Sequence, residues 1–443
     1  MTLPQYGEYK DSGVEWLGEV PRHWKVLPLK RDLAFLTSGS RGWAEHYSDD
    51  GALFIRIGNL TRDSIRLDLS DLQRVEVPSG TEGERTRVLA GDVLFSITAY
   101  LGSVAVVPDN LERSYVSQHV ALARLRKRYF IPAWVAYVTL SFIGKTYLET
   151  QGYGGTKIQL SLDDVANLIM TAPPLPEQTA IAAFLDRETG KIDALVAEQE
   201  KLIALLKEKR QAVISHAVTK GLNPAAPMKN TGIKWLGEVP AHWEIMRGRF
   251  LFQQLDLPPQ EGDGVVTAFR DGQVTLRELR RQDGFTLAVL EVGYQRVREG
   301  DLVIHGMDAF AGAIGVSEAT GKCTPEYAVL TPARTGINNR YFALALRLMA
   351  LRNFIYVICP SVRERAPRFR YETFKDVALP LPPLAEQHNI LAEIATETAK
   401  LDALTAEAQR AIDLLKERRT ALISAAVTGK IDVRGLVDMQ EAA

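Results

Sequence analysis

The chain has 443 residues, of which 46% are hydrophobic and 24% are charged, and its formal net charge is −1. This composition is typical of a folded protein with several domains, and it excludes a disordered chain, a fibrous protein and a surface covered with positive charge. Because the sequence contains no run of about 18 apolar residues and no secretion signal, we expect a cytoplasmic protein. The two cysteines, Cys323 and Cys359, are too few for a disulfide framework or a cysteine-rich zinc site.

The first motif in chain order is DSGVEWLGEVPRHW at residues 11–24, and it returns as NTGIKWLGEVPAHW at residues 230–243. Self-similarity at a long spacing indicates that one structural unit is used twice. The aromatic residues of this opening motif recur with it, so we expect them to pack within a shared scaffold and not to stack on a ligand. These residues are Trp16, His23, Trp24, Trp235, His242 and Trp243.

Two bodies of mixed but β-rich character follow the two opening motifs, at about 20–172 and 239–381. Short runs of β-branched residues that are bounded by Gly, Asp or Pro predict their strands. The expected strands are 52–59, 92–97 and 103–107 in the first body and 265–269, 301–305 and 313–316 in the second. One helix is expected in each body, at 132–147 and at 339–355.

Three polar loops of the first body are candidates for contact with DNA. Arginine can engage guanine with two hydrogen bonds and glutamine can engage adenine, while lysine and backbone amides bind phosphates. For any single residue, an ordinary solvated turn is the alternative. The candidates are Arg41 and Trp43 at a loop tip, Gln118 and His119 between strands, and Tyr153, Thr156, Lys157 and Gln159 in a glycine-rich loop.

A Pro-rich hinge, PPLPEQ at 173–178, precedes a long helix that we expect to end near Gly221. Apolar residues in this helix step by four and three, a heptad pattern that predicts packing against another helix. The pattern returns after a second hinge, PPLAEQ at 382–387, so two helices of about 40 residues, or about 60 Å, should pair antiparallel. The predicted seam consists of Leu185, Ile192, Leu195, Leu202 and Leu206 in the first helix and of Ile394, Leu401, Leu404, Leu415 and Leu422 in the second.

A basic segment, SVRERAPRFRY at 361–371, lies just before the second hinge, in the place that the glycine-rich loop has before the first hinge. Its arginines Arg363, Arg365, Arg368 and Arg370 are candidates for DNA contact, with a solvated run of charges as the alternative. A second basic stretch contains Arg270, Arg277, Arg280 and Arg281, for which structural and DNA-binding roles are equally compatible with the sequence.

The chain is therefore expected to be an α+β protein with an internal pseudo-two-fold repeat, in which two β-rich bodies are separated by two long antiparallel helices. The expected parts are a first body at 1–172, a first helix at 173–222, a second body at 223–381 and a second helix at 382–443. The opening motif and the helices repeat closely, whereas the bodies diverge. A scaffold that is used twice keeps its shape, but readers of two different targets should differ.

Catalytic signatures are absent from the sequence in the forms that we sought. Gly144-Lys145-Thr146 resembles the end of a phosphate-binding loop, but Thr139 stands where the leading glycine would be. Asp256-Leu257-Pro258-Pro259 lacks the aromatic residue of an amino-methyltransferase motif, because Gln260 takes its place. No histidine has a metal-ligand spacing to Cys, Asp or Glu. We therefore expect no catalytic residue and no metal in this chain.

The tandem WLGEVPxHW motifs, the PPLPEQ and PPLAEQ hinges, the two LLKE-[KR]-R helices that end in AVT and the divergent bodies occur together. In this combination the chain resembles, over nearly its whole length, the specificity subunit of type I restriction–modification systems. The resemblance implies two target-recognition domains that each read half of an interrupted site in double-stranded DNA. It also implies that the helices set the spacing and dock methylation subunits, two in number, and through them motor-endonuclease subunits. S-adenosylmethionine, ATP and magnesium would bind to those partners, and no cofactor to this chain.

Three other interpretations stay open at the level of sequence. They are a nuclease whose motif is sparse, a coiled-coil scaffold that binds only proteins, and the recognition module of another kind of restriction enzyme. Binding to DNA with and without sequence preference, and nicking in the presence of magnesium, distinguish them.

Overall fold

The computed structural model describes residues 3–39, 41–78, 81–153, 158–280, 292–359 and 368–436. The chain divides into two compact units. Unit 1 contains residues 1–200 and 408–443, and unit 2 contains residues 201–407. Each unit holds one β-rich body together with part of both long helices, α5 (Leu175–Lys220) and α10 (Leu384–Val427). The predicted α+β fold class, with two β-rich regions and two long helices packed together, is confirmed.

The body of unit 1 is built on a four-stranded antiparallel sheet. Its strands, in order across the sheet, are β4 (Leu33–Ser38), β11 (Val120–Leu125), β8 (Val93–Ser96) and β9 (Val104–Val106). Successive side chains of a strand point to opposite faces. Accordingly, Val93 and Phe95 of β8 belong to the main core with Trp24 and Trp134, whereas Leu94 belongs to a second core. Strand β8 is therefore buried on both faces.

Smaller elements surround this sheet. Helices α2 (Pro132–Leu140) and α3 (Phe142–Gln151) take the place of the single helix expected at 132–147, since the chain breaks at Ser141, whose hydroxyl donates to the Val138 carbonyl at 2.6 Å. The other elements are β1 (Tyr9–Asp11) with β2 (Glu19–Pro21), β3 (Lys25–Pro28) with β12 (Ile169–Ala172), the sheet β10 (Ser114–Val116), β6 (Ala52–Ile55), β7 (Arg74–Val75) and β5 (Tyr47–Ser48), and the short helices α1 (Thr81–Thr86) and α4 (Leu162–Ala166).

The body of unit 2 repeats the central sheet in the same strand order. Its strands are β16 (Phe252–Gln254), β23 (Tyr327–Pro332), β20 (Leu302–His305) and β21 (Ile314–Val316). The residues of β20 alternate between two cores as those of β8 do, with Leu302 and Ile304 in one and Val303 in the other. The same buried framework is thus built from different side chains in the two bodies.

Helices α7 (Asn339–Leu351) and α8 (Phe354–Ile358) lie where one helix was expected at 339–355, because Asn353 adopts a left-handed conformation with φ 56° and ends the first of them. The remaining elements of unit 2 are β13 (Met228–Asn230) with β14 (Glu238–Pro240), β15 (Glu244–Arg247) with β24 (Ala378–Leu381), β17 (Val266–Ala268) with β18 (Val274–Leu276), β19 (Gln295–Val297) with β22 (Gly321–Cys323), and the short helices α6 (Gly248–Leu251) and α9 (Tyr371–Phe374).

The opening motif packs against the first turn of each long helix. In unit 1, Glu177 accepts hydrogen bonds from the Tyr6 hydroxyl at 2.7 Å and the Trp24 indole at 3.0 Å, and its other oxygen lies 2.8 Å from His23 Nε2. In unit 2, Glu386 lies 2.8 Å from His242 Nε2. The expected scaffold packing is confirmed for Trp24, Trp235 and Trp243, which are buried, but Trp16 is 37% exposed.

The next residue of each helix, Gln178 or Gln387, is fully buried and fastens the helix to its body. The Gln178 side chain accepts from the Ile131 backbone amide at 3.0 Å and donates to the carbonyls of Tyr129 and Pro173. Gln387 makes the matching three bonds in unit 2. The hinge sequence PPLPEQ or PPLAEQ therefore fixes the direction in which each helix leaves its body.

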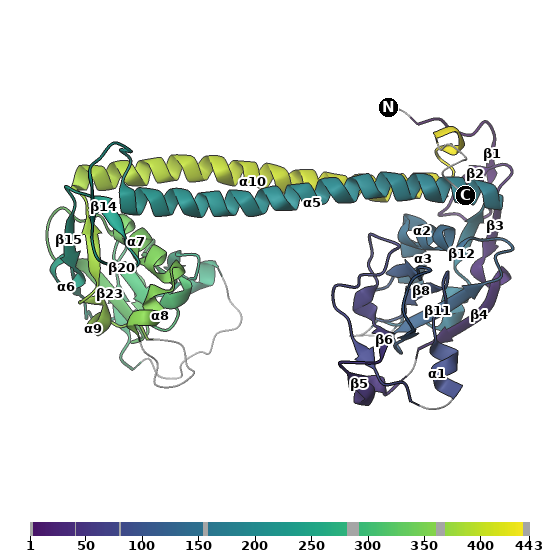
Figure 1. Ribbon diagram of the computed structural model, residues 1–443, viewed down its shortest axis with the longest axis horizontal. Helices are drawn as coiled ribbons and strands as arrows, with labels where there is room; N and C mark the ends of the chain where they lie inside the picture. Colours follow the sequence, from purple (N-terminus) through teal and green to yellow (C-terminus); the bar gives the residue numbers. More distant parts are fainter. Residues whose placement is uncertain are drawn as a thin grey trace. The chain divides into compact units, whose positions relative to one another are not determined.

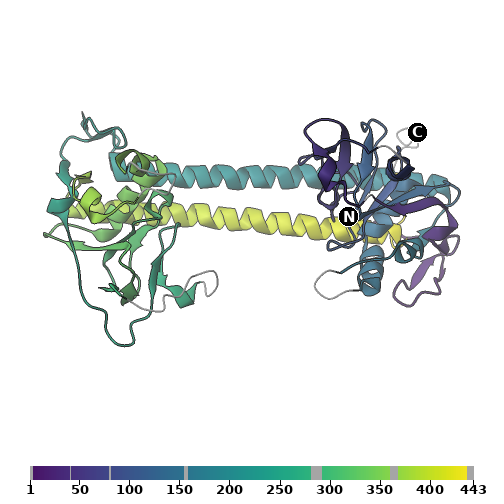
Figure 2. The same ribbon diagram turned by 90° about the horizontal axis from the view of Figure 1, so that it is seen from below.

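Helices α5 and α10 run antiparallel, since each unit contains the start of one helix and the end of the other. Figure 1 shows them side by side, and the view from below in Figure 2 agrees. Equivalent ion pairs link them in each unit: Arg210 lies 3.2 Å from Asp402 in unit 2, and Arg419 contacts Asp193 in unit 1. The antiparallel pairing predicted from the heptads is confirmed.

The predicted seam is correct in part. Leu185, Ile192, Leu206, Ile394 and Leu401 are buried, and Leu415 and Leu422 are half-buried. Leu195, Leu202 and Leu404 are instead exposed by 44%, 42% and 50%, so their assignment to the seam is wrong. The next residues along the chain, Val196, Ile203 and Thr405, are half-buried in their place. Ile192 and Leu206, two heptads apart, both stay buried, so the seven-residue spacing holds and only the second contact position of each heptad lies one residue later than predicted.

Candidate nucleic-acid interface

A cavity of 330 Å³ in unit 1 brings together five residues that the sequence predicts to touch DNA. Arg41, Gln118, His119, Tyr153 and Gln159 line it, with Ser38, Ile97, Thr98, Leu160 and Leu162. We call it the first cavity. It lies where β8 ends and β11 begins, and none of the described residues that line it is acidic.

Backbone hydrogen bonds beyond the ends of the strands position these side chains. The Ile97 amide donates to the His119 carbonyl at 3.1 Å, which extends the β8–β11 ladder by one residue. The Leu160 amide donates to the Ile97 carbonyl at 3.0 Å, so the segment before α4 lies along the end of β8. Tyr153 and Gln159 exchange backbone hydrogen bonds of 3.0 and 2.8 Å. The cavity wall is therefore held by main-chain contacts, whatever side chains it carries.

The side chains of the first cavity are mostly neutral donors and acceptors. The Thr98 hydroxyl lies 2.8 Å from His119 Nδ1, and the Gln118 amide nitrogen lies 3.1 Å from His119 Nε2. Tyr153 is 56% exposed, and Arg41 and Gln159 are exposed as well. This set can present both donors and acceptors to the edge of a base, with Arg41 for a guanine or a phosphate.

Trp43 does not lie at an exposed loop tip, as the sequence had suggested. It is 4% exposed and stacks on Phe54, with ring centroids 5.7 Å apart and an interplanar angle of 21°. It begins the short 3-10 helix Trp43–His46, and its ring also packs on Tyr115. Trp43 is thus part of a small core and is removed from the candidates for DNA contact. Thr156 and Lys157 lie outside the described residues.

A second cavity, of 640 Å³, lies in unit 2 beside the matching end of β20. Arg270, Arg277, Arg280, His305, Asp308 and Tyr327 contribute to its lining. Arg270 pairs with Asp308 at 2.9 Å, and Arg280 donates to Asp271 at 2.8 Å while lying 4.2 Å above the Phe269 ring. Of the four arginines in the predicted basic stretch, Arg270, Arg277 and Arg280 line the second cavity, whereas Arg281 lies outside the described residues.

His305 is a half-buried polar residue of the second cavity. Its ring stacks on Tyr327 with centroids 4.4 Å apart, and Nδ1 lies 3.1 Å from Asp308. Burial lowers the pKa of His305 and raises the pKa of Tyr327 to about 12, so both rings are uncharged at neutral pH. Sequence reasoning missed His305, the last residue of β20, and Asp308 just after that strand, although β20 repeats β8 and the end of β8 also carries polar residues.

Arg368 and Arg370 lie next to the second cavity. Their guanidinium groups are 3.3 and 3.9 Å from Glu326 Oε1, and their side chains are 53% and 59% exposed. The Phe369 amide between them donates to the Gly306 carbonyl, so they stand at the same end of the sheet as His305, and their contact with DNA stays a prediction. Arg363 and Arg365 lie outside the described residues.

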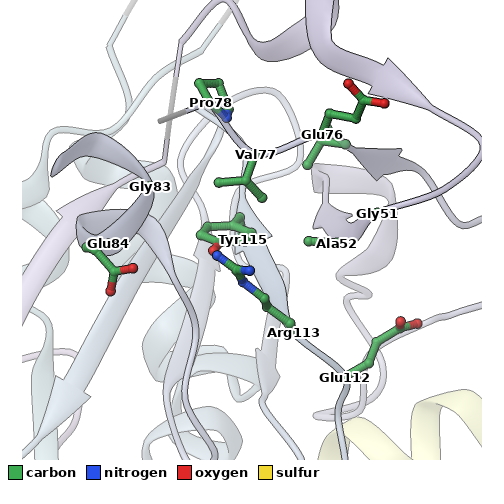
Figure 3. Close-up of a pocket in the computed structure, with 11 residues that line it drawn as sticks. Gly51, Ala52, Glu76, Val77, Pro78, Gly83, Glu84, Glu112, Arg113 and Tyr115 are labelled. Atoms are coloured by element: carbon green, nitrogen blue, oxygen red, sulfur yellow. The ribbon is translucent and has the colours of Figure 1, made fainter. Parts of the chain in front are cut away.

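A third cavity, of 620 Å³, differs from these two in charge (Figure 3). Glu76, Glu84 and Glu112 lie around it, and Arg113 points toward Tyr115, whose hydroxyl accepts from Arg113 Nε at 2.8 Å. Arg74 binds Glu112 with two hydrogen bonds of 2.8 Å and lowers the pKa of that carboxyl. Three carboxylates repel phosphates, so this cavity is a poor candidate for DNA contact.

Two further searches bear on other kinds of site. Among the described residues, no group of three His, Cys, Asp or Glu side chains has an arrangement that could hold a metal ion. No helix within the described ranges is long and apolar enough to cross a membrane.

Comparison with known proteins matches the chain to one family. Residues 54–204 match the type I restriction modification DNA specificity domain. The specificity subunit of the type I restriction enzyme EcoBI from Escherichia coli is 22% identical, over 96% of this chain and 90% of that protein. The EcoKI specificity subunit from Escherichia coli strain K12 is 21% identical, over 94% of this chain and 90% of that protein.

Solved structures have the same fold. The HsdS subunit from Thermoanaerobacter tengcongensis has a TM-score of 0.52 and 18% identity, and the match covers 93% of this chain and 98% of that one. A chain solved in work on complex assembly of the type I restriction–modification system has a TM-score of 0.59 and 19% identity, with 92% and 98% covered. The resemblance found in the sequence is confirmed: the chain is similar to the specificity subunits of type I restriction–modification systems in a family model, in relatives over most of its length and in fold.

Proposed function

We propose that the chain binds double-stranded DNA at an interrupted site and that each body reads one half of it. The observation that carries the proposal is the position of the first and second cavities, which open at the same end of matching sheets and carry different polar side chains. Arg41, Gln118, His119, Tyr153 and Gln159 would contact one half-site. Arg270, Arg368 and Arg370 would contact the other, together with the predicted residues Thr156, Lys157, Arg281, Arg363 and Arg365 in their respective bodies.

In this proposal the chain recognises DNA and catalyses nothing itself. Methylation subunits, two in number, would dock on it and carry S-adenosylmethionine, and motor-endonuclease subunits would join through them and carry ATP and magnesium. Leu195, Leu202 and Leu404 support a docking role for the helices, since they are apolar side chains of α5 and α10 that are 42–50% exposed. Replacing Leu195 and Leu404 by Gln should prevent co-purification of the methylation subunits, whereas Lys207→Gln, on the same helix pair, should not.

The long helices would set the distance between the half-sites. Helix α5 has 46 residues and α10 has 44, which at about 1.5 Å per residue gives roughly 65–70 Å. Inserting one heptad after Glu200 and another after Glu407 lengthens both helices by about 10 Å and preserves the contact face. The gap in the recognised sequence should then grow by about three base pairs, since base pairs are spaced by about 3.4 Å. An unchanged gap would contradict this part of the proposal.

The main test is selection of bound duplexes from a random pool, with the full chain and its methylation subunits at a stated salt concentration. We expect a motif of two short conserved blocks with an unspecified gap. Arg41→Ala and Arg270→Ala should each weaken binding. If no sequence preference is found, the chain is a protein scaffold and not a reader of DNA. If the purified chain nicks DNA in magnesium without partners, it is a nuclease.

A further inference from the structure

The two bodies have equivalent backbone positions, identified by the same backbone hydrogen bonds, but carry different side chains there. In unit 1, the Ile97 amide donates to the carbonyl of His119 at 3.1 Å. In unit 2, the Gly306 amide donates to the carbonyl of Glu326 at 2.9 Å. Ile97 and Gly306 each follow the last residue of the equivalent strands β8 and β20. His119 and Glu326 therefore occupy the same place in the two bodies.

A second pair of positions matches in the same way. The Leu160 amide donates to the Ile97 carbonyl at 3.0 Å, and the Phe369 amide donates to the Gly306 carbonyl at 2.8 Å. Leu160 and Phe369 are both buried, which anchors the segment in each body. The residue before each anchor is exposed: Gln159 in unit 1 and Arg368 in unit 2. Gln159 and Arg368 are thus the second equivalent pair.

The chemistry at these positions differs between the bodies. In unit 1, Gln159 lines the first cavity with His119, whose ring nitrogens face Thr98 and Gln118, so the group presents hydrogen-bond donors and acceptors and contains no carboxylate. In unit 2, Arg368 Nη1 lies 3.3 Å from Glu326 Oε1, while Glu326 Oε2 is buried without a hydrogen-bond partner. A carboxylate that binds one edge of a guanidinium group fixes the orientation of the remaining N–H donors of that group. Donors in fixed directions are needed to recognise the edge of a base. A phosphate needs no such orientation, because a cation that moves freely binds it equally well.

We propose that Gln159 and Arg368 are equivalent specificity-determining residues, and that they make the two half-sites differ in base composition. Gln159, beside His119, would read the adenine of an A·T pair through its N6 and N7 atoms. Arg368, held by Glu326, would read the guanine of a G·C pair through O6 and N7. This inference rests on the proposed function, because it assumes that both bodies contact DNA. It adds which residue of each body selects a base, and which base.

The test is to exchange the two side chains in the full chain and repeat the selection from random duplexes with the methylation subunits present. Arg368→Gln should change the preference at one base pair of one half-site from G·C toward A·T, with the other half-site unchanged. Gln159→Arg should change one base pair of the other half-site from A·T toward G·C. Each change should alter the preference for that base pair by about tenfold or more.

Matched controls separate base reading from a change in charge. Arg334→Gln and Gln5→Arg make the same replacements at exposed positions that line neither cavity, and they should leave the motif unchanged. Glu326→Gln should reduce the preference at the same base pair as Arg368→Gln, because it releases the guanidinium group. Thermal unfolding of each variant shows whether it is folded.

The outcomes separate this inference from the proposed function. If the unaltered chain selects no two-part motif, the proposed function fails. If it selects one, but Arg368→Gln and Gln159→Arg leave every base preference in place, the inference is wrong and the proposed function stands. Loss of affinity for all sequences, with a salt slope smaller by about one, would assign Arg368 to a phosphate and also overturn the inference.

Discussion

Glu177 and Glu386 occupy the same position at the start of α5 and α10, but their surroundings differ. Glu177 is buried and has four partners, Tyr6, His23, Trp24 and, at 3.9 Å, Arg434. Glu386 is 25% exposed at its side chain, and its one side-chain partner among the described residues is His242. Trp243, the counterpart of Trp24, is buried with an indole nitrogen that has no hydrogen-bond partner. The repeated motif thus preserves the place of these residues without preserving the strength of their contacts.

Part of the difference comes from one residue outside the opening motif. Tyr6 precedes the first motif, and the corresponding position before the second motif is Ala225. Burial and the bond to Glu177 raise the pKa of Tyr6, so its hydroxyl keeps the proton that it donates. Unit 1 therefore has a buried phenol–carboxylate bond at its helix start that unit 2 cannot form. The comparison predicts that the first helix start is the more strongly held of the two.

Replacing the acid by alanine should have the largest effect. Glu177→Ala leaves a buried phenol and a buried indole without an acceptor, and we expect a loss of about 3–5 kcal/mol in the stability of unit 1. Glu386→Ala removes one partly exposed pair and should cost about 1 kcal/mol or less in unit 2. Hydrogen exchange in residues 3–36 and 228–247 measures the two effects separately. Equal losses would show that the two helix starts are equivalent after all.

Alanine replacements along the helix contact face should have the next largest effects, and here the two repeats should agree. Ile192 and Leu401 are equivalent and buried, so Ile192→Ala and Leu401→Ala should each cost about 2–4 kcal/mol. Leu195 and Leu404 are equivalent and exposed, so their alanine variants should stay within about 0.5 kcal/mol of the parent. Chemical unfolding curves give these values. A large loss for Leu195→Ala would restore the seam that the heptad grid predicted.

The smallest expected effect is a loss of stability at acidic pH, and we expect it in unit 2 alone. His305 stands at the position where the first body has Ser96, and burial lowers its pKa below the usual 6.5. As the pH falls through about 6.5, the unfolded chain takes up a proton that folded unit 2 does not, so stability falls by at most about 1.4 kcal/mol per pH unit. His305→Gln should remove this component, whereas His216→Gln, at an exposed position, should not. Thermal unfolding at about pH 7.5 and pH 5.5 provides the comparison, and an unchanged pH dependence in His305→Gln would refute it.

The repeat, the long helices and their direction follow from the sequence, because repeated motifs and heptads are local signals. The β-rich character of the bodies also follows, since short β-branched runs such as that of β8 carry it. The helix breaks at Ser141 and Asn353 were missed because each break is caused by a single polar residue within a largely apolar stretch that otherwise favours a helix. The seam was misplaced by one residue in three places. At 195–196 and 202–203 two apolar residues stand side by side, and the sequence alone does not show which of each pair faces the partner helix.

The candidate site could be predicted where a loop directly follows or precedes a repeated strand. It could not be predicted where burial depends on residues that are far apart along the chain. Gln118, His119 and Gln159 meet in one cavity because the ends of β8 and β11 bring their segments together. Trp43 is surrounded in sequence by glycine and polar residues, which suggests exposure. Its burial against Phe54 and Tyr115 depends on two strands that lie well apart from it along the chain.

Unit 1 is assembled from both ends of the chain, whereas unit 2 is one uninterrupted stretch. The core around Trp24 and Trp134 includes Ile423, Val427 and Val433 from the last helix and the residues after it. During synthesis on the ribosome, unit 2 can therefore be complete while unit 1 still lacks part of its core. A premature stop after residue 407 would spare the later body and damage the one that was made first.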